Sequence, residues 1–536
     1  MAQNFIGVDV GTGSARAGVF DASGKLLGSA KRDITMWREP GEIAEQSSEN
    51  IWQAICASVR QAMAEAGVDA SSVGGLGFDA TCSLVVLDQD GAPLSVGNGG
   101  PERNIIVWMD HRATEQAERI NAGGYGVLDY VGGKISPEME TPKLLWLKEN
   151  RPEIWAKAWQ FFDLADYLGW RATGSLARST CPVTCKWTYL AHENRWDDSY
   201  FRAIGLGDLV DEGFARIGTE IVPPGTKLGA GLTEAAAADL GLVAGTPVGA
   251  GMIDAHAGGI GSVGASGGQG KITSRMAYVF GTSACTMSST EEAAFVPGVW
   301  GPYFSAMVPG LWLNEGGQSL AGAAIDALVQ FHPAKAEAEA KAAAEGVSLL
   351  EWLSRQALAG AADASSCVDL AAGLHVVPDL LGNRSPHADP NARGMISGLG
   401  IETGIASLVG LYIAAICSLG YGLRQIADAQ RAKGVETECI VISGGAGQNP
   451  LVRQLMADSS GIAVALPQTP EPVLLGAAML GAVAGGAAPD LASAMGQMSA
   501  LAGTLAPNAA RADLHSRRYK AFGLLQDAER QTRALF

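Results

Sequence analysis

The sequence is poor in cationic side chains. Its 38 Lys and Arg residues stand against 55 Asp and Glu residues, so the 536-residue chain carries a formal net charge of -17. Nucleic acids and anionic membrane surfaces both require a cationic face on the protein that binds them. The charge balance therefore argues against either partner, although a small anionic ligand remains compatible where a few local donors receive it.

Cysteine and histidine are also sparse. The eight cysteines include no CxxC pair and the seven histidines are dispersed, so no zinc-binding spacing is visible. A chain of this size needs no disulfide staples, and we interpret the CxxxC of Cys181 and Cys185 as two buried thiols. The N-terminal residues show neither a basic segment nor a long apolar run, so we see no signal peptide and expect a reduced, cytoplasmic protein.

One stretch of the sequence could be mistaken for a membrane-spanning helix. Residues 403–423 contain no charged side chain, and a membrane-spanning helix needs about 20 apolar residues. However, this stretch contains four glycines and several polar residues. We therefore predict a helix buried inside a large protein, and no membrane association.

The chain begins with a pattern of short strands. Its length predicts two to four domains, and the pattern predicts strands over residues 5–10, 15–20 and 25–30, separated by turns. The first turn, DVGTGSAR, offers backbone N–H groups that can form a nest for phosphate oxygens, and Asp9 could hold a magnesium ion through water. A plain hairpin turn is the alternative. The spacing matches neither a P-loop nor a GxGxxG fingerprint.

A second turn of the same kind follows the strand at residues 275–280. It reads Gly281-Thr282-Ser283 and lies about half a chain length after the first. Two such turns suggest an internal duplication that places two similar α/β domains around one cleft. The glycine-rich residues 261–270 look like a flexible connection, so we expect domains at 1–262 and 263–536.

The stretch GAGMIDAHAGG, residues 249–259, carries one acidic residue between small ones. We expect a helix to begin at Asp254, where the helix dipole favours an ionised carboxylate and the glycines leave room for a ligand. An ionised Asp254 in this position could act as a general base. An ordinary Asp N-cap is the structural alternative.

Other polar groups follow predicted strands or glycine turns. The clusters are the GFDATCS turn, the WMDHR segment at residues 108–112, the isolated Lys186 and the GGAGQNP turn at residues 444–450. Glycines in the last of these would let an adenine or a ribose lie against the backbone. The alternatives are a solvated helix start for Asp110, a surface position for Lys186 and a merely structural turn at 444–450.

These motifs occur in the order found in a known family. DVGTGSARAG, GFDATCS, WMDHRA, PKLLWLKEN, GMIDAHAGG, FGTSACTM, GNRSPHADPNARG and SGGAGQNP together resemble the FGGY carbohydrate kinases over residues 4 to 485. GFDATCS, WMDH and GNRSPHADPNARG resemble the ribulokinase branch, and GFDATCSLVVLD resembles kinases of D-ribulose. One departure is Ser418-Leu419-Gly420, where the family often has Glu before Gly.

The resemblance implies an α/β fold with two actin-like, ribonuclease-H-like domains around an interdomain cleft. It implies ATP and Mg²⁺ as cofactors, a sugar as substrate, and commonly a homodimer. The N-terminal domain would bind the sugar, and the C-terminal domain, which ends in a charged helix, would bind the nucleotide. The site residues that it implies are Asp254 as the base; Asp9 for the metal; Thr12, Gly13, Ser14, Arg16, Gly281 and Thr282 for phosphates; Gly322, Asp326, Gly445 and Asn449 for the nucleotide; and Thr81, Cys82, Asp110, Lys186, Glu315 and Gln318 for the sugar.

The expected function is ATP-dependent phosphorylation of a ketopentose, D-ribulose to D-ribulose 5-phosphate. L-Ribulose, another pentulose or a pentitol is an alternative substrate. An alternative of another class is a non-catalytic actin-like switch moved by ATP. A pure switch would not need Asp254, Lys186, Asp110 and Glu315 together.

Overall fold

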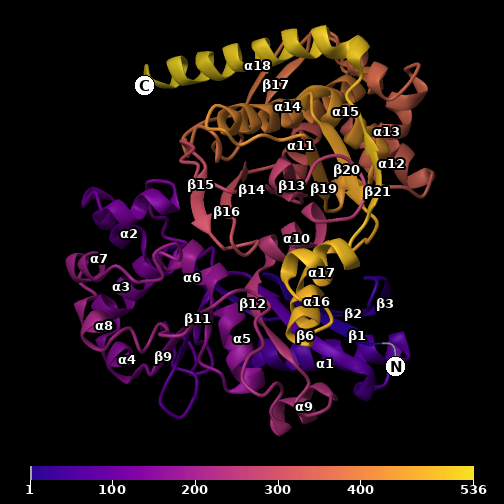
Figure 1. Cartoon of the computed structure of the whole chain (residues 1–536). Coiled ribbons are helices and arrows are strands. Elements are labelled where there is room, and N and C mark those ends of the chain that lie inside the picture. Colours follow the sequence, from indigo (N-terminus) through magenta and orange to yellow (C-terminus); the bar gives the residue numbers. More distant parts are fainter. Residues whose placement is uncertain (1–2) are drawn as a thin grey trace.

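The computed structural model describes residues 3–536, which form two α/β lobes joined by a pair of helices (Figure 1). The first lobe is built on a five-stranded sheet of order β12-β6-β1-β2-β3. Its strands are β1 (Asn4–Val10), β2 (Ser14–Asp21), β3 (Leu26–Asp33), β6 (Val73–Ala80) and β12 (Val248–Ile253). The three strands predicted at the start of the chain are confirmed.

The second lobe repeats this arrangement. Its seven-stranded sheet has the order β15-β16-β14-β13-β19-β20-β21. Strand β13 pairs antiparallel with β14 and parallel with β19, as β1 pairs antiparallel with β2 and parallel with β6. The two halves therefore share the strand arrangement expected of two similar α/β domains. The strands are β13 (Arg275–Phe280), β14 (Ala284–Thr290), β15 (Trp300–Phe304), β16 (Trp312–Gln318), β19 (Cys439–Ser443), β20 (Ala463–Pro467) and β21 (Leu501–Leu505).

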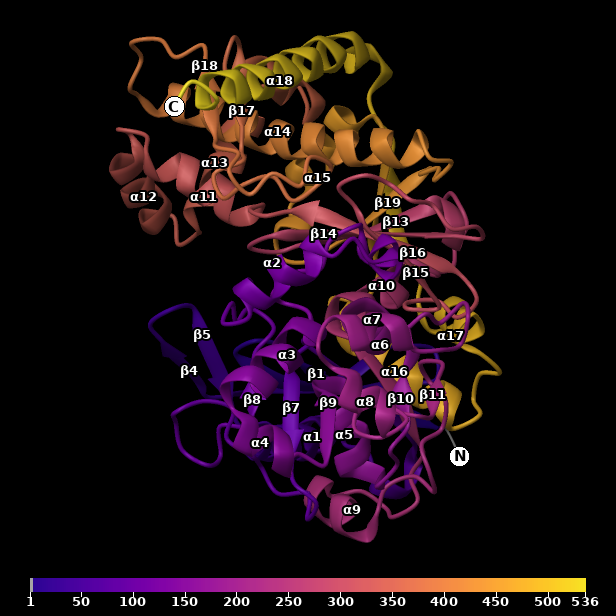
Figure 2. The ribbon, with the colours of Figure 1, turned by 90° about the vertical axis from the view of Figure 1, so that its left-hand side faces the viewer.

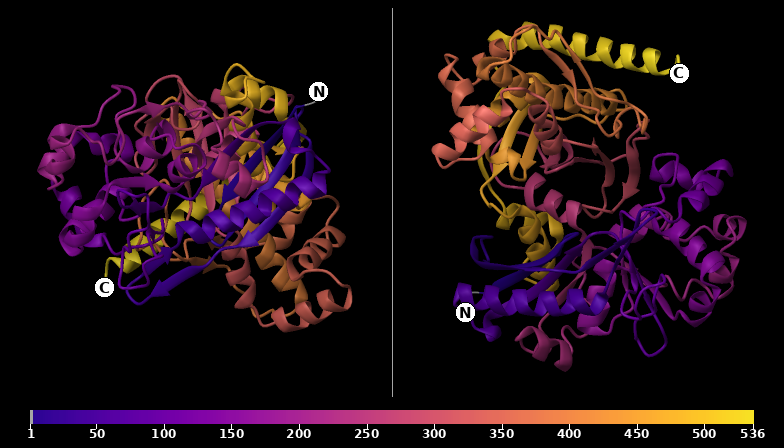
Figure 3. Two further views of the ribbon diagram at one scale, coloured as in Figure 1. Left: turned by 90° about the horizontal axis from the view of Figure 1, so that it is seen from below. Right: turned by 180° about the vertical axis from the view of Figure 1, so that it is seen from behind.

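Each half of the chain contributes one helix that packs on the sheet of the other half. Helix α10 (Asp254–Val263) follows the last strand of the first sheet but packs on β13 and β19 of the second. Helix α16 (Pro472–Ala484) follows β20 but packs on β1, β6 and β12 of the first sheet, and the two helices cross each other. Figure 1 and the rear view in Figure 3 show the yellow α16 inside the indigo lobe.

Glycines allow this close packing. A Cβ on Gly7, Gly75 or Gly77 would collide with a carbonyl oxygen of α16. The crossing of α10 and α16 depends on Gly261 and Gly476 in the same way, because a side chain on either would meet backbone of the other helix. The helix backbone therefore lies directly on the strands.

The remaining elements cover these sheets. Helix α1 (Ser48–Ala66) packs on β2 and β3, and its N-cap Ser47 accepts a hydrogen bond from the Asn50 backbone N–H. A second sheet of the first lobe, of order β4-β5-β8-β7-β9, comprises β4 (Met36–Glu39), β5 (Ile43–Gln46), β7 (Leu84–Leu87), β8 (Ile105–Ile106) and β9 (Gln160–Asp163). The other elements of this lobe, seen in Figure 2, are α2 (Thr114–Ala122), α3 (Glu140–Asn150), α4 (Pro152–Lys157), α5 (Leu164–Thr173), α6 (Thr180–Lys186), α7 (Asp198–Ala203), α8 (Gly207–Asp211), α9 (Glu234–Leu240) and the short strands β10 (Arg178–Ser179) and β11 (Ile221–Val222).

The predicted buried helix is confirmed. Helix α14 (Ile405–Arg431) is long and apolar enough to cross a membrane, but 83% of its most apolar window is buried within the protein. It lies among the other elements of the second lobe, which are α11 (Gly322–Gln330), α12 (Lys335–Ala344), α13 (Leu349–Ala359), α15 (Pro450–Ser460), α18 (Ala512–Arg533), β17 (His375–Val377) and β18 (Met395–Ser397). Helix α17 (Leu491–Met498) lies apart from them and packs on α16 and α10. The charged C-terminal helix is also confirmed as α18.

The flexible connection predicted over residues 261–270 begins later than expected. Helix α10 continues to Val263, so the first three of these residues are helical and buried. Packing explains the difference, because Gly261 lies against the start of α16, where a larger residue has no room.

Candidate active site

Three carboxylates gather at one edge of the first sheet. Asp9 lies near the end of β1, and Asp79 is its partner residue on the parallel strand β6. On the other side of β6, Met252 of β12 pairs with Asp79, and Asp254 follows two residues later. The carboxyl ends of parallel strands meet at one edge of a sheet, and the three side chains meet there.

Asp254 is the first residue of α10. The N-cap position belongs to Ile253, so the alternative interpretation of Asp254 as an N-cap is wrong. Its Oδ1 accepts the backbone N–H of Ala255 at 2.8 Å, within the positive first turn of the helix. Burial and the neighbouring charge of Asp9 nevertheless raise the pKa of Asp254 to about 6.

Asp79 is a site residue that the sequence interpretation missed, although the GFDATCS motif contains it. It is fully buried, and neither carboxylate oxygen has a hydrogen-bond partner among residues 3–536. Burial, followed by the charges of Asp9 and Asp254, raises its pKa well above the usual range. This favours a neutral side chain in the absence of a cation.

Arg16 pairs with carboxylates. Its Nε donates to Asp9 Oδ2 at 2.8 Å, and its Nη1 donates to Glu471 Oε2 at 2.9 Å, just before α16. The expected phosphate contact of Arg16 therefore stays a prediction.

The residues present fit a magnesium ion held through water. No group of three or more His, Cys, Asp or Glu side chains among residues 3–536 is arranged to hold a metal directly. The unpartnered oxygens of Asp79 beside Asp9 are nevertheless donors of the kind that a hard cation prefers. A cation there would also reduce the repulsion among the three carboxylates.

The first glycine turn lies against the GFDATCS turn. Trp108 Nε1 donates to Thr12 Oγ1 at 3.0 Å, and the Trp108 backbone N–H donates to Ser83 Oγ at 3.1 Å. Ser83 Oγ lies 3.4 Å from Thr81 Oγ1. Trp108 thus connects the predicted phosphate turn at Thr12 to the predicted sugar turn at Ser83.

Both glycine turns leave space for a ligand. A Cβ on Gly13 would meet no atom within 4 Å, and one on Gly281 would meet only the Ser283 carbonyl oxygen at 3.6 Å. Gly13, Gly281 and Thr282 are exposed, while Ser14 is half-buried at the start of β2. Such open glycine turns suit close approach of phosphate oxygens.

The second turn is docked on the start of α11. The backbone N–H of Gly322 donates to Gly281 O at 3.0 Å, and that of Ala321 donates to Thr282 O at 2.8 Å. A side chain on Gly322 would crowd the same carbonyl of Gly281. Gly322 thus positions the turn, and Asp326 is exposed one helical turn later.

The expected adenosine contacts lie at the start of α15. Gly445 is exposed and has open space at its Cβ position. Asn449 caps the helix by accepting the Leu451 N–H at 2.9 Å, and it donates to Ser354 Oγ at 2.7 Å. Its amide is therefore engaged within the protein, and its contact with adenosine stays a prediction.

Lys186 and Glu315 come together between the lobes. Lys186 is only 7% exposed, so its alternative interpretation as a surface lysine is wrong. Its Nζ lies 5.5 Å from the centre of the Trp300 ring of β15, as does the Arg384 guanidinium. Burial alone would raise the pKa of Glu315, but the His256 hydrogen bond and the charges of Lys186 and Arg384 lower it to about 2.

Cys82 lies beside this cluster. It is buried, and burial raises the pKa of its thiol, against the effect of the Lys186 charge.

Gln318 is engaged at both ends of its amide, since Tyr278 donates to its Oε1 at 2.6 Å and its Nε2 donates to Leu419 O at 3.0 Å. It connects β13, β16 and α14, and its sugar contact stays a prediction.

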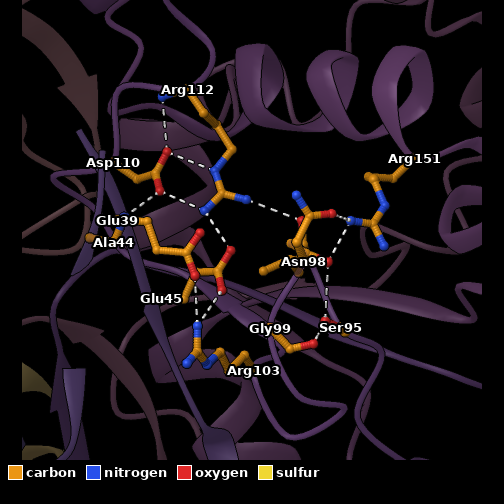
Figure 4. Close-up of polar contacts among 12 residues, drawn as sticks. Glu39, Ala44, Glu45, Ser95, Asn98, Gly99, Arg103, Asp110, Arg112 and Arg151 are labelled. Carbon is orange, nitrogen blue, oxygen red and sulfur yellow. Dashed lines mark hydrogen bonds and ion pairs between the residues drawn. The ribbon is translucent and has the colours of Figure 1, made fainter. Parts of the chain in front are cut away.

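Asp110 is engaged elsewhere in the first lobe (Figure 4). It is fully buried, and its oxygens accept the Ala44 N–H at 2.7 Å, the Arg112 N–H at 2.9 Å and two bonds from the Arg112 guanidinium. Arg112 also donates to Glu45 at 2.9 Å. Both carboxylate oxygens of Asp110 are thus engaged within the protein, and its contact with the sugar stays a prediction.

Two further residues were missed within quoted motifs. Arg384, in the GNRSPH segment, faces the Trp300 ring and lies 3.6 Å from Cys285 Sγ through its Nη1. His256, in the GMIDAHAGG segment, is fully buried and contacts both Cys181 and Glu315. The motifs contained both residues, but their partners lie far away in sequence.

Comparison with known proteins agrees with this geometry. The model of the N-terminal domain of the FGGY family of carbohydrate kinases matches residues 4–261, and that of the C-terminal domain matches residues 276–485. The chain belongs to the FGGY family of carbohydrate kinases. It is therefore an ATP-dependent sugar kinase.

Several FGGY relatives match over most of their length. The FGGY carbohydrate kinase domain-containing protein of Homo sapiens is 46% identical, covering 99% of this chain and 97% of its own. A D-ribulokinase of Saccharomyces cerevisiae is 39% identical, covering 90% of this chain and 72% of its own.

Solved structures show the fold. A xylulose kinase from Rhodospirillum rubrum superposes with a TM-score of 0.80 at 22% identity, covering 98% of this chain and 99% of the other. A glycerol kinase from Plasmodium falciparum, solved with ADP, gives 0.75 at 15% identity over 97% of both chains. The two lobes are thus the actin-like, ribonuclease-H-like pair that the sequence predicted.

Proposed function

We propose that this FGGY kinase transfers the terminal phosphoryl group of ATP to the primary hydroxyl of a ketopentose, D-ribulose, with Asp254 as the general base. The observation that carries the proposal is the meeting of Lys186, Glu315 and Trp300 between the lobes, near Asp254. The D-ribulokinase of Saccharomyces cerevisiae supports the choice of sugar, since it is 39% identical to this chain.

The polar pair suits a polyhydroxylated ligand. An ionised Glu315 can only accept hydrogen bonds, and the Lys186 ammonium can only donate them. Sugar hydroxyls do both, and the ketose carbonyl accepts. The Trp300 ring beside these charges supplies an apolar face against which the C–H side of a sugar can pack.

The chain's residues have two tasks in the transfer. Phosphoryl transfer passes through a loose transition state, so the acceptor oxygen must be aligned and charge must be neutralised. Asp254 takes the proton of the primary hydroxyl, while the turns around Gly13 and Gly281 receive phosphate oxygens. A magnesium ion near Asp9 would neutralise phosphate charge when it is bound.

The test is the substitution Asp254→Asn. General-base catalysis is typically worth about 10²- to 10⁴-fold, so we expect kcat with D-ribulose to fall by at least about a hundredfold while ATP binding stays largely intact. ADP release measures the first quantity and nucleotide titration the second. Near-normal turnover would remove Asp254 from this role.

The sugar is tested with a panel. We expect the highest kcat/KM with D-ribulose when D-ribulose, L-ribulose, D-xylulose, L-xylulose, ribitol and glycerol are compared. Epimers differ only in hydroxyl direction, and rejection of a wrong epimer comes from polar groups left unpaired in the site. If none of these six compounds increases ADP formation, the ketopentose substrate is refuted.

A further inference from the structure

His256 connects the two lobes beside the proposed base. It lies on α10 two residues after Asp254, and its side chain is fully buried. Its Nδ1 is 3.1 Å from the Cys181 sulfur of α6, in the first lobe. Its Nε2 is 3.4 Å from Glu315 Oε2 of β16, in the second lobe.

The charge of Glu315 fixes the role of one ring nitrogen. Glu315 is ionised and can only accept, so Nε2 of His256 carries the hydrogen that it donates to Oε2. Nδ1 contacts the Cys181 sulfur, which also accepts a hydrogen bond from the Ile253 backbone N–H at 3.4 Å. Cys181 and Cys185 are both fully buried, as the sequence predicted, so neither solvent nor a mobile side chain competes for the ring.

The two oxygens of Glu315 therefore differ. Oε2 receives His256, whereas no hydrogen bond engages Oε1 among residues 3–536. A carboxylate fixed through one oxygen presents the other in a defined direction. Since a sugar epimer is selected by hydrogen-bond direction, fixing this oxygen is a way to fix specificity.

We propose that His256 is a positioning residue for the sugar: anchored by Cys181, it orients Glu315 so that its free oxygen accepts a hydroxyl of the substrate bound at Asp254. This rests on the proposed sugar site. Because the base and His256 share the first turn of α10, one rigid element sets the distance between the reacting hydroxyl and the hydroxyl that Glu315 recognises.

A buried histidine can instead serve packing alone, and kinetics separate the two roles. We would compare His256→Leu, which removes both polar contacts, with His256→Gln, whose amide nitrogen can still donate to Glu315. His515→Leu is the matched control, since His515 is equally buried in the second lobe, where its Nδ1 bonds to the Tyr421 hydroxyl at 2.9 Å.

Hydrogen bonds to charged groups are strong enough for a clear effect. We expect His256→Leu to raise the KM for the ketopentose by about 10- to 100-fold and to leave the KM for ATP within about twofold. His256→Gln should recover most of the loss, and His515→Leu should change neither KM. An unchanged sugar KM in His256→Leu would overturn the proposal.

A double-mutant cycle tests whether His256 acts through Glu315. If it does, His256→Leu combined with Glu315→Gln should be no worse than Glu315→Gln alone, whereas independent roles would give multiplied losses and overturn the proposal. If His256→Leu fails to fold, the cycle is run with Cys181→Ala, which removes the anchor on Nδ1. A wild-type enzyme that phosphorylates no ketopentose would refute the proposed function instead, which is a different outcome.

Discussion

The carboxylate of Asp254 stands in surroundings that oppose its ionisation. Burial and the charge of Asp9 raise its pKa to about 6, while the Ala255 N–H and the helix dipole favour the charged form. A base works best when its pKa lies just below the working pH, because it is then ionised and still accepts a proton readily. The opposing influences on Asp254 give it this property.

This pKa predicts a pH dependence of the rate. Only the ionised form of Asp254 accepts the hydroxyl proton, so kcat/KM for the sugar should be constant above pH 7 and should fall about tenfold per pH unit below pH 6. Initial rates from pH 5 to 8 measure it, with nucleotide binding over the same range as the control for intact protein. A flat profile would contradict Asp254 as the base.

Residue type was readable from the sequence more reliably than residue partners. Lys186 and Glu315, which the family resemblance assigns to the sugar, lie close enough for the Lys186 charge to lower the pKa of Glu315. Asp110 and Asn449 have the right chemistry but are engaged by Arg112 and by the start of α15. Nothing within their own segments shows this, since a hydrogen-bond partner depends on tertiary packing.

Among the elements, α10 and α16 matter most for the site. Helix α10 carries both Asp254 and His256, and α16 fixes the edge of the first sheet that holds Asp9 and Asp79. The ion pair of Arg16 with Glu471 joins the first phosphate turn to the start of α16. Any displacement of α16 would therefore move the carboxylate cluster.

The glycines beneath α16 predict a stability effect. In Gly77→Ala the new methyl group would collide with the Ala477 carbonyl, so we expect a loss of about 1–3 kcal/mol in the free energy of unfolding. The matched control is Gly523→Ala in α18, where the Cβ meets open space and alanine favours the helix by roughly 0.5–1 kcal/mol. Denaturant unfolding measures both, and equal stability of the two variants would contradict the packing argument.

The elements themselves were largely predictable. The apolar run at residues 5–10 located β1 closely, and the uncharged stretch at residues 403–423 located α14, which continues to Arg431. The exchange of α10 and α16 was not predictable, since both helices are rich in small residues and no local pattern shows which sheet they cover.

At the scale of the whole molecule, the division of the sequence near residue 262 separates the strands of the two sheets but not the helices that cover them. The first sheet is covered on one face by α16, which the second half of the chain supplies. We propose that the domains nevertheless act as the sugar side and the nucleotide side of the enzyme. The homodimer and the cytoplasmic location stay predictions.

This arrangement predicts how fragments behave. Residues 1–262 alone should be insoluble or unfold without cooperativity, because β1, β6 and β12 lose the apolar face of α16. Joining residues 472–498 to residue 262 through a short Gly/Ser linker should restore solubility, since Gly261 lies against Pro472. Soluble expression and denaturant unfolding measure this. A cooperative fold for residues 1–262 alone would contradict it.

The same exchange has a consequence during synthesis. The strands of the first sheet leave the ribosome early, but the helix that covers them is translated only at residues 472–484. At a synthesis rate of about 5–20 residues per second, the apolar face of the first sheet stays uncovered for on the order of tens of seconds before α16 is made. The nascent chain therefore offers chaperones a long interval in which to bind, and the rate of translation through the second half sets how long that surface is open to aggregation.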